Sequence, residues 1–437
     1  MENNLPQGWV ECSLGEILTA KKGKKPASVI NEPKAGYVPY ILIDEMEGKP
    51  VRAYTNDPKV SIIDESEVLL VWDGSIGKCG SGLKGAIGST LVGLKALDKI
   101  QTKFLEYTIK QQNNFIKETS TGTGLQHINK DFFEICRIPL PPLAEQHRIV
   151  AKLDAIMQKV ENNKQHLDKI PKLLKRFRQS VLAAAVSGKL TEDWRKKNYI
   201  VEEWENKTLL DVIKEKPKNG YSAKPVNYKT PFRVLTLTAT TSGKFKSEHF
   251  KFFDEKINFD SPFWIQPNDI LIQRGNTIEY VGVSAIYDGE PNKFIYPDLM
   301  MRVRANNNIL TTYLYYVLSD ENSRKYLRER ATGTAGNMPK INQPILISLP
   351  IELPQKKEQK EIVRRVEQLF AFADKVEARY TKAKAMLDKL PQSILAKAFR
   401  GELVPQNPND EPASVLLERI KAEKEKLAEK RNLRKKI

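Results

Sequence analysis

Residues 145–190 read EQHRIVAKLDAIMQKVENNKQHLDKIPKLLKRFRQSVLAAAVSGKL, and residues 358–403 read EQKEIVRRVEQLFAFADKVEARYTKAKAMLDKLPQSILAKAFRGEL. The two stretches align without a gap at a constant offset of 213 residues, so that Glu145 corresponds to Glu358. Weaker similarity continues upstream of both copies in the same order. An internal repeat of this extent predicts a duplicated architecture, with two halves that each run from a globular region into the same kind of segment.

Apolar residues recur in both copies at alternating spacings of four and three. This 3.5-residue period indicates a helix that pairs with another helix. Because the chain has two such segments, we expect them to pair with each other; amphipathic helices that lie on globular cores are the alternative. The seam positions are Ile149, Leu153, Ile156, Val160, Leu167 and Leu174 in the first copy, and Ile362, Val366, Leu369, Val376, Leu387 and Ile394 in the second.

Prolines and glycines mark the expected ends of these helices. A proline-rich stretch precedes each copy, and Gly188 or Gly401 follows its last turn. At about 1.5 Å per residue, roughly 43 helical residues span on the order of 60 Å, which is the length of a spacer. Pro171 and Pro391 lie inside the copies and are expected to kink or restart the helices, because proline lacks the backbone N–H that the helix needs.

The regions before the two copies mix short strand-like runs with helical patterns, so each is predicted to be a small α+β domain with its own core. The predicted fold is therefore α+β, with two similar globular domains separated by two long antiparallel coiled-coil helices in an internal pseudo-two-fold repeat. The expected divisions are domain 1 at residues 1–143, the first spacer helix at 144–190, a linker with domain 2 at 191–353, the second spacer helix at 354–404, and a basic helical tail at 405–437.

The composition favours a polyanionic partner. The formal net charge is +17 and the pI is about 9.4, which suits nucleic acid or an anionic membrane surface. No apolar run approaches the roughly 18 residues that span a bilayer, and the N-terminus lacks the features of a signal peptide, so a cytoplasmic protein without membrane contact is expected. The three cysteines are far apart in sequence and form no CxxC pair, so no disulfide framework or zinc site is expected.

Lysines cluster near the start of each globular domain, interrupted by Gly23 or Gly220. Such lysines can neutralise phosphates, although a solvated basic loop has the same composition. The candidates are Lys21, Lys22, Lys24 and Lys25 in domain 1, and Lys216 and Lys218, within a wider group that includes Lys214 and Lys224, in domain 2.

Turns that follow predicted strands, and later polar loops, also carry candidate DNA-binding residues. Arginine and asparagine can make bidentate contacts to base edges, whereas glycine-containing hairpin turns and tyrosines that only pack are the structural alternatives. The turn candidates are Trp72, Asp73, Ser75 and Lys78 in domain 1, and Arg274 and Asn276 in domain 2. The loop candidates are Thr121, Thr123, Gln126, Lys130, Thr332, Thr334, Asn337 and Lys340, and the aromatic candidates are Tyr221 and Tyr280.

Catalytic motifs are missing. The sequence has no Asn-Pro-Pro-Tyr or Asp-Pro-Pro-Tyr motif of an amino-methyltransferase, and its four histidines show no metal-ligand spacing. Gly80, Gly82 and Gly85 formally satisfy GxGxxG, but a strand-like run follows them where a nucleotide site needs a helix. We therefore expect no catalytic residue, no metal and no bound cofactor in this chain.

The run IPLPPLAEQHRIV at 138–150, with LAAAVSGKL at 182–190, closely resembles the conserved region of type I restriction-modification specificity subunits. The resemblance covers essentially the whole chain and is supported by LPQGW at 5–9 and by ASVLLERI at 413–420. The second copy departs from the pattern, because LPQKKE at 353–358 replaces the usual double proline.

The resemblance implies two target recognition domains that each read one half of an asymmetric bipartite site in double-stranded DNA, held apart by the paired helices. It also implies that the helices dock two modification subunits, which bind S-adenosylmethionine and methylate adenine, and that ATP-dependent restriction subunits complete the nuclease complex. The alternative function is a non-catalytic coiled-coil adaptor without base-specific DNA binding, which would lack salt-sensitive binding to DNA.

Overall fold

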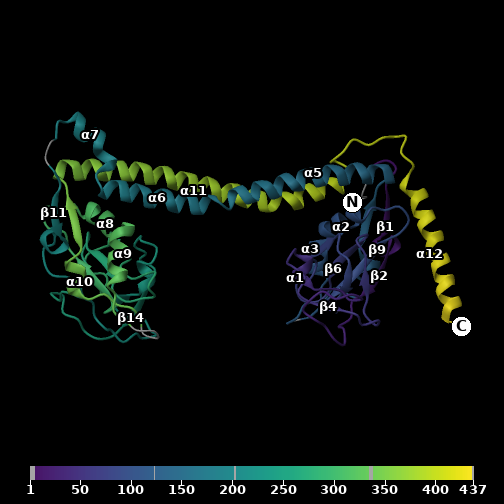
Figure 1. Ribbon diagram of the computed structural model, residues 1–437, viewed down its shortest axis with the longest axis horizontal. Helices are drawn as coiled ribbons and strands as arrows, with labels where there is room; N and C mark the ends of the chain where they lie inside the picture. The colour runs from purple at the N-terminus through teal and green to yellow at the C-terminus, as the bar shows by residue number, and fades with distance from the viewer. Residues whose placement is uncertain (1–4, 123, 201–202, 334–337, 436–437) are drawn as a thin grey trace. The chain divides into compact units, whose positions relative to one another are not determined.

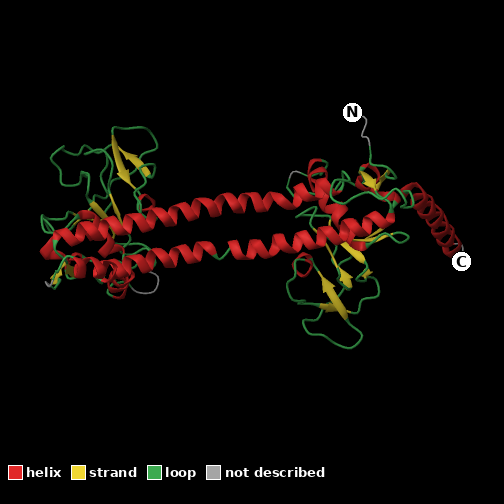
Figure 2. Ribbon diagram, turned by 90° about the horizontal axis from the view of Figure 1, so that it is seen from above, coloured by secondary structure: helices red, strands yellow, loops and turns green. Residues whose placement is uncertain are grey.

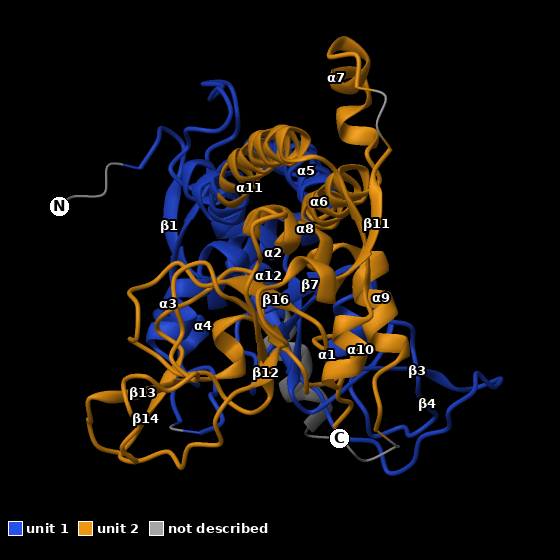
Figure 3. Ribbon diagram, turned by 90° about the vertical axis from the view of Figure 1, so that its left-hand side faces the viewer, with its two compact units in different colours: residues 1–167, 382–437 blue, residues 168–381 orange. Residues whose placement is uncertain are grey.

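The computed structural model describes residues 5–122, 124–200, 203–333 and 338–435, with side chains up to residue 426 (Figure 1). The candidates Thr123, Thr334 and Asn337 lie outside these residues. The chain forms two compact units, unit 1 from residues 1–167 and 382–437 and unit 2 from residues 168–381 (Figure 3). Each unit combines one globular domain with one stretch of paired helices, and the predicted α+β fold with its internal repeat is confirmed.

Three helices form the two repeated segments. The first copy gives α5 (Leu143–Leu167) and α6 (Ile170–Val186), and the second gives the single helix α11 (Lys356–Ala398). The restart expected at Pro171 occurs, since this proline lies in the first turn of α6. α11 continues through Pro391, so no restart occurs there. The residues that follow Pro391 are held by packing, because Ile394 and Leu395 belong to the apolar core of unit 1.

The helices pair within each unit. In unit 2, α6 runs beside the N-terminal part of α11 (Figure 2), where Arg178 Nη2 lies 2.6 Å from Asp374 Oδ1 and the rings of Phe177 and Phe372 are in contact. Arg365 Nη1 donates to the carbonyl of Leu190 at 2.7 Å, so the two helices are antiparallel. In unit 1, Lys164 Nζ of α5 lies 3.7 Å from Asp388 Oδ1 of α11.

The seam side chains divide into two groups by exposure. The buried ones are Ile149, Leu153, Val160, Leu174, Ile362, Val366 and Ile394, and the half-buried ones are Ile156, Leu167, Leu369, Val376 and Leu387. Those near the domains also join the domain cores: Ile149 and Leu153 share one cluster with domain 1, and Ile362 shares another with domain 2. The ends of the helices therefore both pair with each other and lie on globular cores, which combines the two interpretations of the seam.

Domain 1 has two small sheets and a terminal ribbon. One sheet has the strand order β2-β9-β6-β7, the other β4-β3-β8-β5, and β1 pairs with β10. The strands are β1 (Val10–Ser13), β2 (Leu18–Lys22), β3 (Val38–Ile41), β4 (Tyr54–Thr55), β5 (Ile62–Ile63), β6 (Glu67–Val71), β7 (Cys79–Ser81), β8 (Gly85–Ile87), β9 (Leu91–Ala96) and β10 (Arg137–Leu140). The helices are α1 (Ile43–Met46), α2 (Thr102–Gln111), α3 (Asn113–Glu118) and α4 (Phe132–Ile135).

Domain 2 repeats this plan. Its larger sheet has the order β12-β17-β15-β16, β13 pairs with β14, and β11 pairs with β18. The strands are β11 (Glu205–Thr208), β12 (Lys218–Asn219), β13 (Phe232–Leu235), β14 (Phe250–Phe253), β15 (Ile270–Gln273), β16 (Ser284–Ile286), β17 (Met300–Val303) and β18 (Pro350–Leu353). The helices are α7 (Glu192–Lys197), α8 (Thr311–Ser319), α9 (Glu321–Glu329) and α10 (Gln343–Ile347).

A tryptophan and a glutamate anchor each domain on its helix. In unit 1, Trp9 Nε1 donates to Glu145 Oε2 at 2.9 Å, and in unit 2, Trp204 Nε1 donates to Glu358 Oε2 at 3.0 Å. Both carboxylates are buried. Because Glu145 and Glu358 correspond in the repeat, the anchoring contact is part of the duplicated design.

The C-terminal helix α12 (Ala413–Lys435) belongs to unit 1. Its first turns pack Ala413, Leu416 and Ile420 into the core of that unit, and Lys424 donates to the carbonyl of Gly15. Burial lowers the pKa of the Lys424 ammonium from its usual range. Among the described residues, no helix combines the length and apolar character needed to cross a membrane.

Candidate nucleic-acid interface

In domain 1, the turn after β6 lies against a later polar loop. The N–H of Ile128 donates to the carbonyl of Trp72 at 3.0 Å, and the N–H of Gly74 donates to the carbonyl of Gln126 at 2.8 Å. Thr121 and His127 exchange two backbone hydrogen bonds of 2.9 Å, which closes the loop. These backbone bonds bring the candidates Trp72, Asp73, Thr121 and Gln126 into one cluster.

The side chains of this cluster carry charges of both signs. His127 Nδ1 is 2.6 Å from Asp73 Oδ1, and Lys22 Nζ is 3.3 Å from Asp73 Oδ2. The half-buried ring of Trp72 lies 5.4 Å from that of Phe133, so it packs beneath the turn. Asp73 therefore organises the cluster by holding one basic side chain on each carboxylate oxygen.

Domain 2 builds the same cluster from other residues. The N–H of Ile341 donates to the carbonyl of Arg274 at 2.8 Å, and Thr332 and Lys340 exchange two backbone hydrogen bonds of 2.8 Å. Arg274 Nε donates to the carbonyl of Ile341 at 3.3 Å, which holds the guanidinium at the edge of an open pocket of about 360 Å³. The pocket is lined by Arg274, Thr332, Gly333, Met338, Lys340, Ile341 and Asn342.

The matching hydrogen bonds define equivalent positions in the two domains. Each pair below occupies the same place in the backbone scaffold, although the side chains differ in almost every pair. The pairs are Trp72 with Arg274, Asp73 with Gly275, Gly74 with Asn276, Thr121 with Thr332, Gln126 with Pro339, and His127 with Lys340. The two domains therefore present different chemistry on one common framework.

The lysine clusters also lie at equivalent strands. The N–H of Gly23 donates to the carbonyl of Leu91, and the N–H of Gly220 donates to the carbonyl of Met300, so the two glycines occupy equivalent positions. Two residues earlier, Lys21 of β2 therefore corresponds to Lys218 of β12. Each glycine is required by close packing, because a Cβ would lie 2.0 Å from the carbonyl oxygen of Gly88 at position 23 and 2.1 Å from that of Tyr296 at position 220.

Carboxylates engage part of this basic surface. Lys21 Nζ is 2.8 Å from the buried Glu67, and Lys218 Nζ is 3.7 Å from Glu215. Lys24, Lys25 and Lys216 are exposed, and no ion pair to them is found within the described part of the chain. Lys214 and Lys224 of the wider group are exposed in the same way, so several ammonium groups of the two clusters face solvent.

The remaining candidates are exposed or have side-chain contacts of their own. Lys78 forms an ion pair with Glu47, while Ser75 and Lys130 are exposed. Tyr221 packs its ring 5.3 Å from Phe263 and donates its hydroxyl to Glu255, which raises the pKa of that hydroxyl. Tyr280 is exposed on the segment that follows the Arg274 turn.

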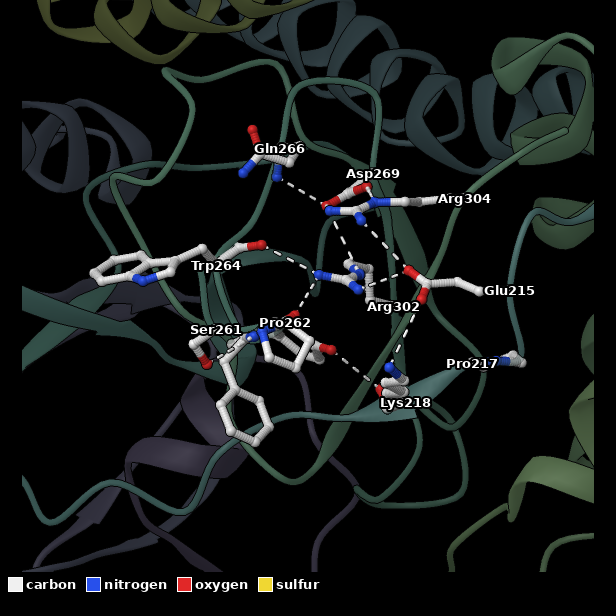
Figure 4. A network of polar contacts seen from close by, with 12 residues as sticks. Glu215, Pro217, Lys218, Ser261, Pro262, Trp264, Gln266, Asp269, Arg302 and Arg304 are labelled. Atoms are coloured by element: carbon white, nitrogen blue, oxygen red, sulfur yellow. Dashed lines mark hydrogen bonds and ion pairs between the residues drawn. The ribbon is translucent and has the colours of Figure 1, made fainter. Parts of the chain in front are cut away.

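Two further arginines of domain 2 are committed to the scaffold (Figure 4). Arg302 Nη2 lies 2.9 Å from Glu215 Oε1, and Arg304 Nε lies 2.6 Å from Asp269 Oδ1. The hydrogen bond to Asp269 raises the pKa of Arg304 above its usual range. Since these carboxylates already satisfy the two cations, this network supports β15 and β17 and leaves Arg274 and Lys340 as the cations of the loop cluster.

The sequence patterns did not identify His127 as part of the candidate interface. A usable signal was present, because the offset of 213 that relates the repeats also relates His127 to the nominated Lys340. In the part of the chain that the structure describes, no group of three or more His, Cys, Asp and Glu side chains is arranged to hold a metal ion.

Two domains of one fold, each with a basic strand and the same loop framework but different side chains, define a protein with two related recognition heads on helical supports. The model for the type I restriction modification DNA specificity domain matches this chain twice, at residues 6–172 and 201–384. The chain therefore belongs to the type I restriction-modification DNA specificity family. The adaptor interpretation, without DNA recognition, is not favoured.

Named relatives share the full length of the chain. The specificity subunit of type I restriction enzyme EcoKI from Escherichia coli K12 is 33% identical over 99% of both chains, and that of StySPI from Salmonella potsdam is 32% identical over 99% of both. The fold is similar to a chain of a type I R-M system solved to explain complex assembly and conformational transition (TM-score 0.69, 20% identity, 91% of this chain and 99% of that one). It is also similar to the HsdS subunit from Thermoanaerobacter tengcongensis (TM-score 0.56, 19% identity, 91% and 98%).

Proposed function

We propose that this chain is the DNA-reading subunit of a type I restriction-modification complex, in which domains 1 and 2 each read one half of an asymmetric bipartite target. One observation carries the proposal: equivalent loop positions in the two domains hold different side chains, such as Asp73 against Gly275 and His127 against Lys340. A common framework places both loops against DNA in the same way, while different side chains select different bases.

The paired helices would serve as spacer and as docking surface. Large apolar side chains remain exposed on them, with Leu173 59% and Phe372 61% exposed in unit 2 and Met386 61% exposed in unit 1. Exposed apolar side chains that recur along helices are suited to bury against protein partners. We assign these positions to contacts with two modification subunits, which would bind S-adenosylmethionine and methylate adenine, while restriction subunits supply the ATP-dependent nuclease.

The proposal is tested by mapping methylated adenines across the genome in cells that make this chain with its modification partner, and in cells that lack the chain. We expect a new motif of two different short halves separated by a fixed gap. No new motif, in cells where the partner is assembled and active with another specificity subunit, would contradict the proposal.

Arg274→Ala is expected to relax base choice in the half-site of domain 2 alone. The guanidinium is held by the carbonyls of Ile341 and Asp298, so it is oriented before DNA binds. Loss of a well-placed arginine costs about 1–3 kcal/mol of discrimination between bases. The measurement is the frequency of each base at every position of the methylated motif.

The matched control is Lys325→Ala, which removes one positive charge from α9 of the same domain, where Lys325 faces Glu329 at 3.8 Å. This control should leave the motif unchanged. If Arg274→Ala also preserved every base preference, Arg274 would be removed from the recognition surface.

A further inference from the structure

His127 and Lys340 occupy the same place in two loops of different length. Each exchanges two backbone hydrogen bonds with a threonine, Thr121 or Thr332, and each forms a β-bridge to the turn that follows the central strand. Domain 2 has two more residues between threonine and partner than domain 1 has. The same backbone hydrogen bonds therefore hold position 127 of domain 1 and position 340 of domain 2, although the segments that precede them differ in length and sequence.

The side chain of His127 is oriented by its neighbour. Asp73 Oδ1 engages Nδ1 at 2.6 Å, which fixes the plane of the ring, and the side chain is 45% exposed. No partner of Nε2 is found among the residues that the structure describes. A histidine held at one nitrogen presents the other in a defined direction, as positioned imidazoles do elsewhere.

Within the ranges that the structure describes, the side chain of Lys340 has no carboxylate beside it of the kind that Asp73 provides for His127. Gly275 stands where domain 1 has Asp73, and a Cβ there would lie 3.1 Å from Lys340 Cγ. Glycine thus leaves room for the lysine stem and removes the carboxylate that would compete for its ammonium. Lys340 is exposed and lines the same pocket as Arg274, so this pocket presents two cationic donors.

We propose that positions 127 and 340 are equivalent specificity-determining positions: Lys340 acts with Arg274 to select the paired acceptors of guanine, and His127, held by Asp73, reads a different base pair in the other half-site. Guanine offers N7 and O6 as acceptors in the major groove, and arginine or lysine is the usual reader of that edge. This inference rests on the proposed function. It names the residues that would make the two half-sites of the DNA target differ in sequence.

A phosphate group offers the same acceptor chemistry as a guanine edge, so the experiment must separate the two sources. A base contact changes which base is preferred at one motif position. A phosphate contact lowers binding to all sequences by a similar factor and reduces its salt dependence. Whether binding is lost for one base or for all sequences therefore distinguishes a base contact from a phosphate contact, even when the loss of binding is small.

The test uses the full chain with its modification partner and four variants, Lys340→Ala, Lys340→Met, His127→Ala and His127→Gln. We expect both variants at 340 to reduce the preference for guanine about five- to hundredfold at one position of one half-site. Both variants at 127 should relax one position of the other half-site. Lys325→Ala is the control for loss of a charge in domain 2.

The outcomes separate this inference from the proposed function. If the wild-type chain directed no bipartite methylation, the proposed function would fail first. If the wild-type motif were present and the variants slowed methylation evenly, or left the motif unchanged, positions 127 and 340 would not determine specificity. The methionine and glutamine variants keep most of the side-chain volume, so if they too abolished methylation of every sequence, the two positions would be structural and the inference would be wrong.

Discussion

Removing residues 172–178 together with residues 374–380 is expected to shorten the gap between the two half-sites while leaving both half-sites unchanged. Arg178 lies opposite Asp374 in antiparallel helices, so the two deleted heptads face each other in unit 2. Deleting seven residues from each helix preserves the alternating spacing of the seam. The spacer loses about 10 Å, roughly the rise of three base pairs.

The target sequence of the double-deletion variant is determined by mapping methylated adenines. We also expect this variant to methylate DNA more slowly than the wild type. Three base pairs turn DNA by about 100° about its axis, whereas a heptad returns a helix close to its starting face. The two domains would therefore meet their half-sites at a changed angle about the DNA axis, and the complex with the shorter gap would be strained. Deleting residues 172–178 alone is the matched control: it makes one helix a heptad shorter than its antiparallel partner, so residues beyond the deletion no longer meet their original partners and we expect no methylation. A double deletion that altered the bases of either half-site would contradict the spacer model.

The helical part of this fold was predictable because its signals are local. Period, proline and glycine act within a few residues, and α5 begins at Leu143 directly after Pro142, while Gly188 after α6 adopts a positive φ of 73°. Pro391 is the exception. Its cost to the helix is local, but the packing of Ile394 and Leu395 that holds the following turn comes from residues far away in sequence.

The loop clusters were only partly predictable, because backbone hydrogen bonds specify their framework and leave the side chains free to differ. Asp73 and Gly275 share no chemistry, yet both bridge to the residue at the equivalent position of the later loop. The polar composition of these loops was sufficient to nominate Arg274 and Lys340. It was not sufficient to show that a histidine stands where Lys340 does.

Pairing partners could not be predicted either. Lys21 and Lys24 look alike in the sequence, but Lys21 reaches across β9 to the buried Glu67 on β6, whereas Lys24 lies beyond the sheet and is exposed. Burial of Glu67 depends on the order of strands β2, β9 and β6. A run of lysines therefore indicates a basic surface without showing which of its charges remain free for DNA.

The two anchoring glutamates are expected to respond oppositely to replacement by glutamine. Glu358 Oε1 accepts from Thr191 Oγ1 at 2.6 Å and from Arg195 Nη1 at 2.5 Å, in addition to the bond from Trp204. Glu358→Gln removes the charge that balances Arg195 and should destabilise unit 2 by about 1.5–3 kcal/mol at pH 7. Hydrogen exchange followed by mass spectrometry would measure this from peptides of each unit separately.

Glu145 has a different environment, because its Oε1 is buried and has no hydrogen-bond partner among the described residues. Burial raises the pKa of its carboxyl, so the folded chain binds this proton more tightly than the unfolded chain does. The resulting stability is fully present below the unfolded pKa of about 4.3 and is lost as the pH rises through the folded value. Glu145→Gln cannot ionise and still accepts from Trp9, so at pH 7 we expect unit 1 to be as stable as the wild type or more so. This advantage should shrink as the pH falls toward 4. The contrary result is that Glu145→Gln destabilises unit 1 at pH 7 as much as Glu358→Gln destabilises unit 2. That result would show that the unpaired carboxylate oxygen of Glu145 does not lower the stability of the wild-type chain.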